Sequence, residues 1–133
     1  MILCKHVYNN FYIFSLYCSG VVRVEEEFQR LGRSVSPPAQ FKTANLNCNK
    51  QKNRYENVLP FDDSRVKLTQ IPGIEGSDYI NANFIDGYMK KKAFIATQAP
   101  IPETMPDFWR MIWQENSLTI VMLCNEMESG RVS

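Results

Sequence analysis

Lys52-Asn53-Arg54-Tyr55-Glu56-Asn57-Val58 is the stretch from which the rest of the chain can be interpreted. Three blocks follow it in order: Asp78-Tyr79-Ile80-Asn81-Ala82-Asn83, Phe94-Ile95-Ala96-Thr97-Gln98-Ala99-Pro100 and Asp107-Phe108-Trp109-Arg110-Met111-Ile112-Trp113. Tyr55 stands between polar residues in a predicted loop, where a tyrosine can offer its flat face to another ring. The alternative is a tyrosine packed on the domain surface.

Apolar patterns predict the strands around this stretch. Val66 and Leu68 alternate with polar residues, as in a half-buried strand. Residues 79–88 and 94–98 are predicted to be two strands joined through a solvated lysine turn. Residues 118–123 form a continuous apolar run, which is typical of a central buried strand.

Two helices are predicted, and they set the fold class. Val24, Phe28 and Leu31 recur at i, i+4 and i+7, which indicates one helix. The second is expected to begin at Thr104 as its N-cap and to fade near residues 116–117. A helix between two strands suggests a crossover and at least one parallel pair. We therefore expect an α/β fold with a twisted mixed β-sheet and flanking helices.

The second helix carries most of the aromatic residues expected in the core. Phe108, Met111 and Ile112 form its predicted buried stripe, with Trp109 and Trp113 beside it. We expect Phe108 and both tryptophans to be core residues, and none of them to be catalytic.

Composition restricts the partners. With 133 residues the chain is long enough for one domain, and 44% hydrophobic and 22% charged residues are typical of a globular protein. A net charge of +1 gives no reason to expect nucleic acid as a partner. The four cysteines form no CxxC pair and no zinc-ligand spacing, so we expect reduced thiols, no metal and no cofactor.

Residues 1–21 differ from the rest, being rich in Phe, Tyr, Ile and Leu. A signal peptide fits the short apolar core at residues 11–18. A membrane span fits poorly, because Asn9, Asn10 and Ser15 interrupt a run that is already short. A translated intron is our preferred hypothesis, since the codons for this segment can resemble the end of an intron. We expect 1–21 to be a non-domain leader, 22–131 to be domain and 132–133 to be read-through.

In that order and at those spacings, the four blocks resemble the N-terminal half of a tyrosine-specific protein phosphatase domain. The resemblance covers about residues 25–131, most closely the receptor type. Residues 44–50 and 73–78 look like the second domain of LAR-type receptors, which is often weak or inactive. Ala99 departs from the family's usual glycine, which puts the local turn geometry in question.

The resemblance implies a substrate-binding set of Tyr55, Asn57 and Val58. Tyr55 looks like the residue that stacks on the phosphotyrosine ring and sets pocket depth, and Val58 resembles the apolar wall beside it. Asn57 stands where many members have an aspartate that accepts hydrogen bonds from the substrate backbone. An amide can still accept one, but without charge assistance. Asn53 and Arg54 are expected to be loop scaffolding.

The family's chemistry requires residues that this sequence does not supply. There is no His-Cys-x5-Arg sequence and no Trp-Pro-Asp, so we expect a partial phosphatase fold truncated before the catalytic loop, without catalytic residues or activity. The expected substrate of the full domain is a phosphotyrosine protein. We expect a cytoplasmic location, or the cytoplasmic side of a membrane receptor, with a membrane only through a receptor tether. The alternative is a non-catalytic module that binds phosphotyrosine or a partner.

Overall fold

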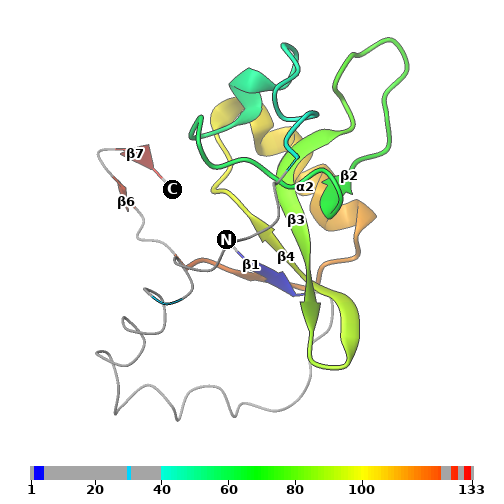
Figure 1. The fold of residues 1–133 in the computed structure, drawn as a ribbon, viewed down its shortest axis with the longest axis vertical. Coiled ribbons are helices and arrows are strands. Elements are labelled where there is room, and N and C mark those ends of the chain that lie inside the picture. The colour runs from blue at the N-terminus through cyan, green and yellow to red at the C-terminus, as the bar shows by residue number, and fades with distance from the viewer. Residues whose placement is uncertain (1, 5–29, 31–39, 124–126, 129–130, 133) are drawn as a thin grey trace. The chain divides into compact units, whose positions relative to one another are not determined.

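The computed structural model describes residues 2–4, 30, 40–123, 127–128 and 131–132. The chain divides into two compact units, residues 1–7 with 40–133 and residues 8–39. Arg30 is the one described residue of the second unit, so the helix predicted from Val24, Phe28 and Leu31 lies outside the described residues. The account below concerns the first unit (Figure 1).

Five strands form the main sheet in the order β2-β3-β4-β1-β5. Their bounds are β1 Ile2–Cys4, β2 Arg65–Lys67, β3 Tyr79–Gly87, β4 Lys90–Thr97 and β5 Thr119–Val121. A separate pair consists of β6 Met127–Glu128 and β7 Arg131–Val132. Three predicted strands are thus confirmed near the expected residues, and a strand also lies within the apolar run 118–123.

β3 separates two layers because its side chains alternate between the faces of the sheet. Ile80 and Ala82 are buried in the core cluster, which also contains Val66, Leu68, Ile95, Phe108 and Met111. Tyr79, Asn81 and Asn83 stand on the opposite face. Each of the three donates a side-chain hydrogen bond to the segment between residues 53 and 64.

The helix α2 spans Met105–Gln114 and packs on the apolar face of the sheet through Phe108 and Met111. Thr104 is its N-cap as predicted, although its hydroxyl accepts from the Ile101 amide at 3.0 Å and makes no cap bond to α2. The 3-10 turn η3, Pro102–Thr104, leads into the helix. Asn116 has φ 50°, a left-handed conformation that ends helices.

Polar side chains of α2 tie it to the sheet. The Gln114 amide nitrogen donates to the carbonyl of Lys67 at 2.8 Å, and its oxygen accepts from the Thr69 amide at 2.7 Å. The Arg110 guanidinium donates to the carbonyl of Ser77. Both ends of the turn between β2 and β3 are therefore fixed to the helix.

The tryptophans of α2 lie mainly outside the core, contrary to our expectation. Phe108 is 4% exposed, but Trp109 is 56% and Trp113 is 86% exposed. Residues 109 and 113 are one turn apart and are rotated by about 100° and 140° from Phe108 at 3.6 residues per turn. Their large apolar side chains suggested burial, but this angle carries them away from the sheet.

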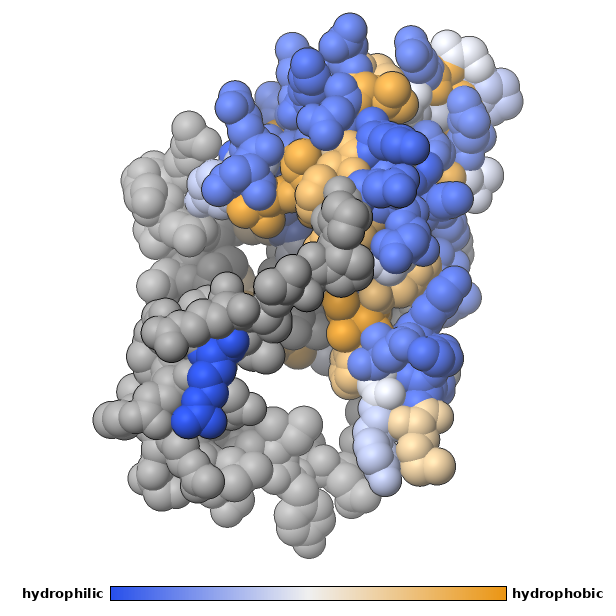
Figure 2. Space-filling view, viewed as in Figure 1, coloured by the Kyte–Doolittle hydropathy of each residue, from blue (hydrophilic) through white to orange (hydrophobic). Residues whose placement is uncertain are grey.

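The strand at the C-terminal end also differs from its prediction. β5 lies at the edge of the five-stranded sheet, and Ile120 and Val121 are 40% and 42% exposed. A continuous apolar run favours a central strand, but among the described strands only β1 pairs with β5. Figure 2 shows that the described part of one face is mostly hydrophilic, with some hydrophobic side chains exposed between the hydrophilic ones.

The α/β class is confirmed, with one difference in strand direction. Every described neighbouring pair is antiparallel, whereas we expected at least one parallel pair. Because β1 is antiparallel to both β4 and β5, these two strands run parallel to each other with β1 between them. The strands before and after the helix thus run in the same direction, as expected, but they are not hydrogen-bonded to each other.

Candidate functional site

The candidate site is the loop Lys52–Val58, which joins the 3-10 turn η2, Lys50–Lys52, to the segment before β2. Tyr55 is 39% and Val58 is 55% exposed, and Asn57 is also exposed. The amide of Val58 donates to the carbonyl of Tyr55 at 3.4 Å. The structure therefore brings all three predicted substrate-binding residues together in one turn. We call these three residues the rim.

The base of the loop is attached to the polar face of β3. The Asn53 side-chain oxygen accepts from the Tyr79 hydroxyl at 2.6 Å and from the Asn81 amide nitrogen at 3.0 Å. The same Asn81 nitrogen donates to the carbonyl of Val58 at 2.8 Å. Asn81 thus joins both ends of the turn that carries Tyr55.

Gln98, just after β4, supplies a second attachment. Its side-chain oxygen accepts from the Arg54 amide at 2.8 Å, and its nitrogen donates to the carbonyl of Lys52 at 2.8 Å. Lys52 also donates through Nζ to the carbonyl of Gly76 at 2.6 Å. Side chains distant in sequence therefore fix the loop backbone on both sides of Asn53.

Tyr79 is fully buried beneath the loop. Burial raises the pKa of its hydroxyl to about 12, although the hydrogen bond to Asn53 acts in the opposite direction. The hydroxyl therefore remains protonated at neutral pH and can donate to Asn53. The protonated hydroxyl matters for the site because the Asn53 oxygen accepts its hydrogen bonds from neutral donors on β3, Tyr79 and Asn81.

Cys48 is the cysteine that Arg54 follows at Cys-x5-Arg spacing, although no histidine precedes it. A phosphate-binding loop needs free backbone N–H groups at a helix N-terminus. Here the amides of residues 49, 50, 52 and 53 all donate to carbonyls within residues 46–50, and the Arg54 amide donates to Gln98. The spacing therefore does not form a phosphate-binding loop.

Ala99, the departure from the usual glycine, fits its turn without left-handed backbone. The described non-glycine residues with positive φ are Met89, Lys92 and Asn116, and Ala99 is not among them. Ala99 is 8% exposed and buries its methyl group. The turn that follows β4 therefore tolerates alanine, and Gln98 can still reach the loop.

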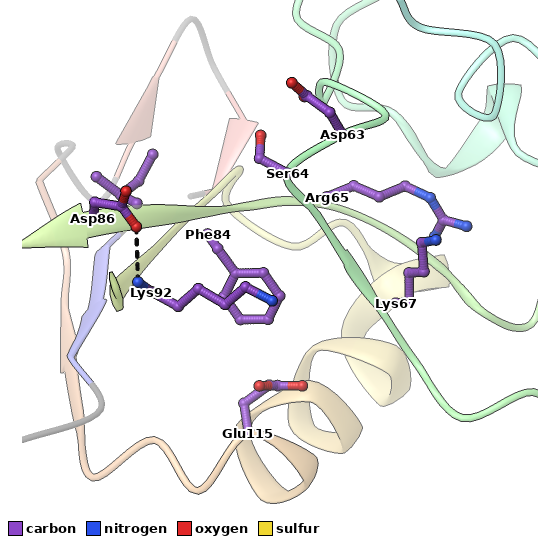
Figure 3. A pocket seen from close by; sticks show the side chains of 9 residues that line it. Asp63, Ser64, Arg65, Lys67, Phe84, Asp86, Lys92 and Glu115 are labelled. Carbon is purple, nitrogen blue, oxygen red and sulfur yellow. Dashed lines mark hydrogen bonds between the residues drawn. The ribbon is translucent and has the colours of Figure 1, made fainter. Parts of the chain in front are cut away.

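Two cavities in the described part of the chain are lined by residues other than the three of the rim. The larger, of about 790 Å³, is lined by residues of β2, β3 and β4 and by Glu115 after α2. Figure 3 shows the Lys92 side chain beside the Phe84 ring, with its nitrogen 4.8 Å from the ring centre. The smaller, of about 350 Å³, is lined by Asn53 and Glu56 among others. Tyr55, Asn57 and Val58 line neither cavity.

The described part of the chain contains no group of three or more His, Cys, Asp or Glu side chains placed to hold a metal ion. Its helices include none that is both long and apolar enough to cross a bilayer.

The sequence predicts Tyr79, Asn81 and Gln98 only as members of the strands 79–88 and 94–98. The signal that could have identified their partner is the alternation in β3, where polar residues 79, 81 and 83 occupy one face opposite Ile80 and Ala82. Periodicity shows that this face is polar. It does not show which loop covers it.

Comparisons with known proteins agree with these features. The family model described as protein-tyrosine phosphatase matches residues 49–133. The chain is 54% identical over 111 residues to receptor-type tyrosine-protein phosphatase S of Gallus gallus, and 54% over 108 residues to receptor-type tyrosine-protein phosphatase F of Homo sapiens. It is 52% identical over 108 residues to tyrosine-protein phosphatase Lar of Drosophila melanogaster.

These matches cover 84%, 80% and 81% of this chain, but only 7%, 6% and 6% of the respective relatives. A solved structure of PTPN18 in complex with HER2-pY1196 phosphopeptides is 44% identical, with a TM-score of 0.65. That likeness covers 71% of this chain and 33% of the other. The chain therefore belongs to the protein-tyrosine phosphatase family, as a receptor-type, LAR-like domain of partial α/β fold.

Proposed function

We propose that the rim binds the phosphotyrosine side chain of a protein substrate, and that the chain is the substrate-recognition part of a receptor-type phosphatase. The observation that carries this proposal is the contrast within Lys52–Val58. The rim is exposed, while hydrogen bonds from Asn81 and Gln98 fix the backbone on either side of Tyr55. Such a loop presents an aromatic ring without having to order itself on binding.

Each rim residue has its own role in this proposal. The Tyr55 ring stacks on the phosphotyrosine ring, a contact worth about 0.5–1.5 kcal/mol beyond area burial. Val58 supplies an apolar wall, and the Asn57 side-chain oxygen accepts a hydrogen bond from the substrate backbone. In the full domain, a deep pocket beside Tyr55 would exclude phosphoserine, because its short side chain would not carry the phosphate to the pocket floor.

Hydrolysis itself belongs to the full domain in this proposal. There a cysteine thiolate attacks phosphorus to form a cysteinyl-phosphate, an aspartic acid protonates the leaving phenolate, and water releases phosphate. The 133 residues contain no His-Cys-x5-Arg sequence, and backbone amides that follow Cys48 donate to nearby carbonyls. We therefore propose that this chain binds without turnover. Its location is the cytoplasmic side of a membrane receptor.

The test is a nuclear magnetic resonance titration of the full chain with three peptides that differ at one residue: phosphotyrosine, tyrosine or phosphoserine. We expect the phosphotyrosine peptide to shift the amides of residues 55–58 and the other two to shift them weakly. Tyr55→Phe should retain the response, because the ring remains, and Tyr55→Ala should lose it. Tyr88→Ala is the matched control, since Tyr88 is 95% exposed on the β3–β4 turn. An equal response to phosphoserine, or none lost in Tyr55→Ala, contradicts the proposal.

A non-catalytic binding module is the second candidate. The hydrogen bonds of the backbone amides between Cys48 and Arg54 favour the binding module, because amides that are already paired cannot bind phosphate beside the Cys48 thiol. Sequencing transcripts of the locus beyond the codon for Arg131 distinguishes the two. Continuation into a His-Cys-x5-Arg sequence supports the enzyme, and a natural transcript that ends without one supports the module.

A further inference from the structure

The turn between β3 and β4 projects from the sheet as a two-stranded hairpin. β2 pairs with β3 as far as Asn83, and β1 pairs with β4 as far as Phe94. Beyond these residues, β3 and β4 pair only with each other among the described strands, ending at Gly87 and Lys90. Figure 1 shows the loop that joins them beyond the ends of β1 and β2. We call residues 85–92 the hairpin end.

The hairpin end exposes large apolar side chains. Tyr88 is 95% and Met89 is 90% exposed, more than any other large hydrophobic residue that the structure describes. Ile85 and Phe94, which are 45% and 36% exposed, lie opposite each other on the two strands beside them. Figure 2 shows pale and light-orange atoms at this end of the described part, next to a blue cluster. Neighbouring exposed apolar side chains of this kind mark interaction sites.

Positive charge is concentrated at the same place. The hairpin end contains Lys90, Lys91 and Lys92 against one carboxylate, Asp86, so its net charge is +2, whereas the net charge of the whole chain is only +1. The Asp86 carboxylate accepts hydrogen bonds from Lys91 Nζ at 2.6 Å and from the Lys92 amide at 2.9 Å, and the second bond is drawn in Figure 3. These bonds hold the lysines beside the apolar tip. A positive surface of this kind attracts an anionic one.

The turn between β2 and β3 is a useful contrast. It also exposes apolar side chains, with Ile71 at 39% and Ile74 at 54%. However, residues 69–78 contain Glu75 and Asp78 and no lysine or arginine. An anionic surface would repel this turn. Of the two turns, only the hairpin end combines an exposed apolar tip with net positive charge.

We propose that the hairpin end binds an anionic membrane surface, with Tyr88 and Met89 entering the headgroup region and the lysines contacting the lipid headgroups. Tyrosine suits this region because its ring is apolar and its hydroxyl is polar. One apolar or one basic signal binds membranes weakly, and the hairpin end supplies both. The contact is additional to any receptor tether, which would raise the local concentration of the hairpin at the membrane. It is separate from the rim and does not depend on the proposed binding of phosphotyrosine.

Cosedimentation of the full chain with lipid vesicles tests the proposal. Vesicles of phosphatidylcholine with about 30% phosphatidylserine present a negative surface, and vesicles of phosphatidylcholine alone are neutral. We expect binding to the anionic vesicles to be at least about tenfold tighter, because lysines near such a surface add to the affinity. The difference should shrink as salt screens the charges. Equal binding to both kinds of vesicle, or binding to neither, would overturn the proposal.

Two double variants separate the apolar and the charged contributions. Tyr88→Ser with Met89→Asn removes the apolar tip, and asparagine tolerates the left-handed backbone of residue 89, where φ is 53°. Lys90→Gln with Lys91→Gln removes two positive charges and keeps the tip. Each double variant should weaken binding to the anionic vesicles by about tenfold.

Ile74→Ser is the matched control for these variants. It removes an exposed apolar side chain from the acidic turn between β2 and β3, and it should bind the anionic vesicles as tightly as wild type. Unchanged binding in either double variant would overturn the hairpin end as the membrane site. So would a loss in Ile74→Ser as large as the loss in the double variants.

Nuclear magnetic resonance of the wild-type chain provides a second measurement that needs no variant. Bicelles of the same anionic composition, carrying a lipid with a chelated paramagnetic ion, broaden the signals of amides that lie close to the headgroups. We expect stronger broadening at residues 86–92 than at residues 71–76. Trp109 and Trp113 of α2 are the competing exposed aromatic residues. Stronger broadening at residues 109–113 than at 86–92, or equal broadening throughout the chain, would contradict the proposal.

Discussion

On one face of β3, Ile80 and Ala82 join the core cluster that contains Phe108 and Met111 of α2. On the other face, Tyr79, Asn81 and Asn83 donate hydrogen bonds to the segment that carries the rim. The first face excludes water by apolar packing, which is not directional. The second fixes individual carbonyl and amide oxygens at 2.6–3.0 Å, which is directional.

This difference separates stability from positioning. Apolar burial contributes most of the free energy of folding, whereas a hydrogen bond contributes about 0.5–1.5 kcal/mol net. The polar face therefore adds less to the stability of the domain, but it decides where Tyr55 and Val58 lie. Variants on the two faces should differ in both the size and the extent of their effects.

Phe108→Ala should have the largest effect, because it removes a core ring that is 4% exposed. Phenylalanine-to-alanine changes in cores cost about 3–5 kcal/mol. Urea unfolding followed by circular dichroism measures the loss of stability. Trp109→Ala is the control one residue away, and with its side chain 56% exposed it should cost about 1 kcal/mol or less. Equal losses of stability in the two variants would mean that Phe108 contributes no more to the core than Trp109 does.

Asn81→Ala should have a smaller effect on the whole domain and a larger one on the loop. It deletes the bonds to Asn53 and to the carbonyl of Val58, and a cost of about 1–3 kcal/mol is expected because partners lose their donor. Hydrogen exchange should accelerate at residues 54–58 more than in β4. Asn83→Ala is the control, because its side chain bonds to Phe61 and Ser64 instead. Faster exchange spread evenly over the sheet would show that Asn81 supports the core.

Tyr79→Phe tests the buried donor on the polar face of β3. At neutral pH the variant loses the hydrogen bond to Asn53 and should be less stable by about 1 kcal/mol. The folded pKa of about 12 lies above the ordinary value of 10, so the protonated hydroxyl stabilises the wild-type fold below pH 10. This contribution is lost as the pH rises from 10 to 12, because the unfolded tyrosine ionises first.

The measurement is the stability difference between wild type and Tyr79→Phe at pH 8 and at pH 11–12. It should fall by on the order of 2 kcal/mol, since one pKa unit corresponds to about 1.4 kcal/mol. Tyr88→Phe serves as the control at an exposed tyrosine. A difference that does not change with pH would mean that the Tyr79 hydroxyl ionises as easily folded as unfolded.

The apolar face was the part of the fold that the sequence predicts well. Alternation at Val66 and Leu68 and the stripe of Phe108, Met111 and Ile112 identify residues that are indeed packed together. The same apolar signals wrongly predict that Trp109 is buried and that β5 is a central strand. Side-chain size does not fix the angle around a helix, and an apolar run does not reveal which strands will flank it.

The candidate site likewise has one part that the sequence predicts and one part that it does not. Tyr55, Asn57 and Val58 could be chosen because they are adjacent in an ordered set of blocks, and the structure brings them together in one exposed turn. Their supports, Asn81 and Gln98, lie about 25 and 45 residues away in the chain. No local pattern specifies such partners, because an amide side chain fits many acceptors.

Asn57→Asp should have the smallest effect, since it changes neither face of β3. Asn57 is exposed at the rim, so stability should stay within about 0.5 kcal/mol of wild type. Binding of a phosphotyrosine peptide should tighten by about three- to tenfold, because a carboxylate accepts a stronger, charge-assisted hydrogen bond from a backbone amide. The gain should shrink with salt and should disappear for a peptide whose backbone amides near the phosphotyrosine are methylated. Unchanged affinity in low salt would mean that residue 57 does not face the substrate backbone, and the rim would then consist of Tyr55 and Val58 alone.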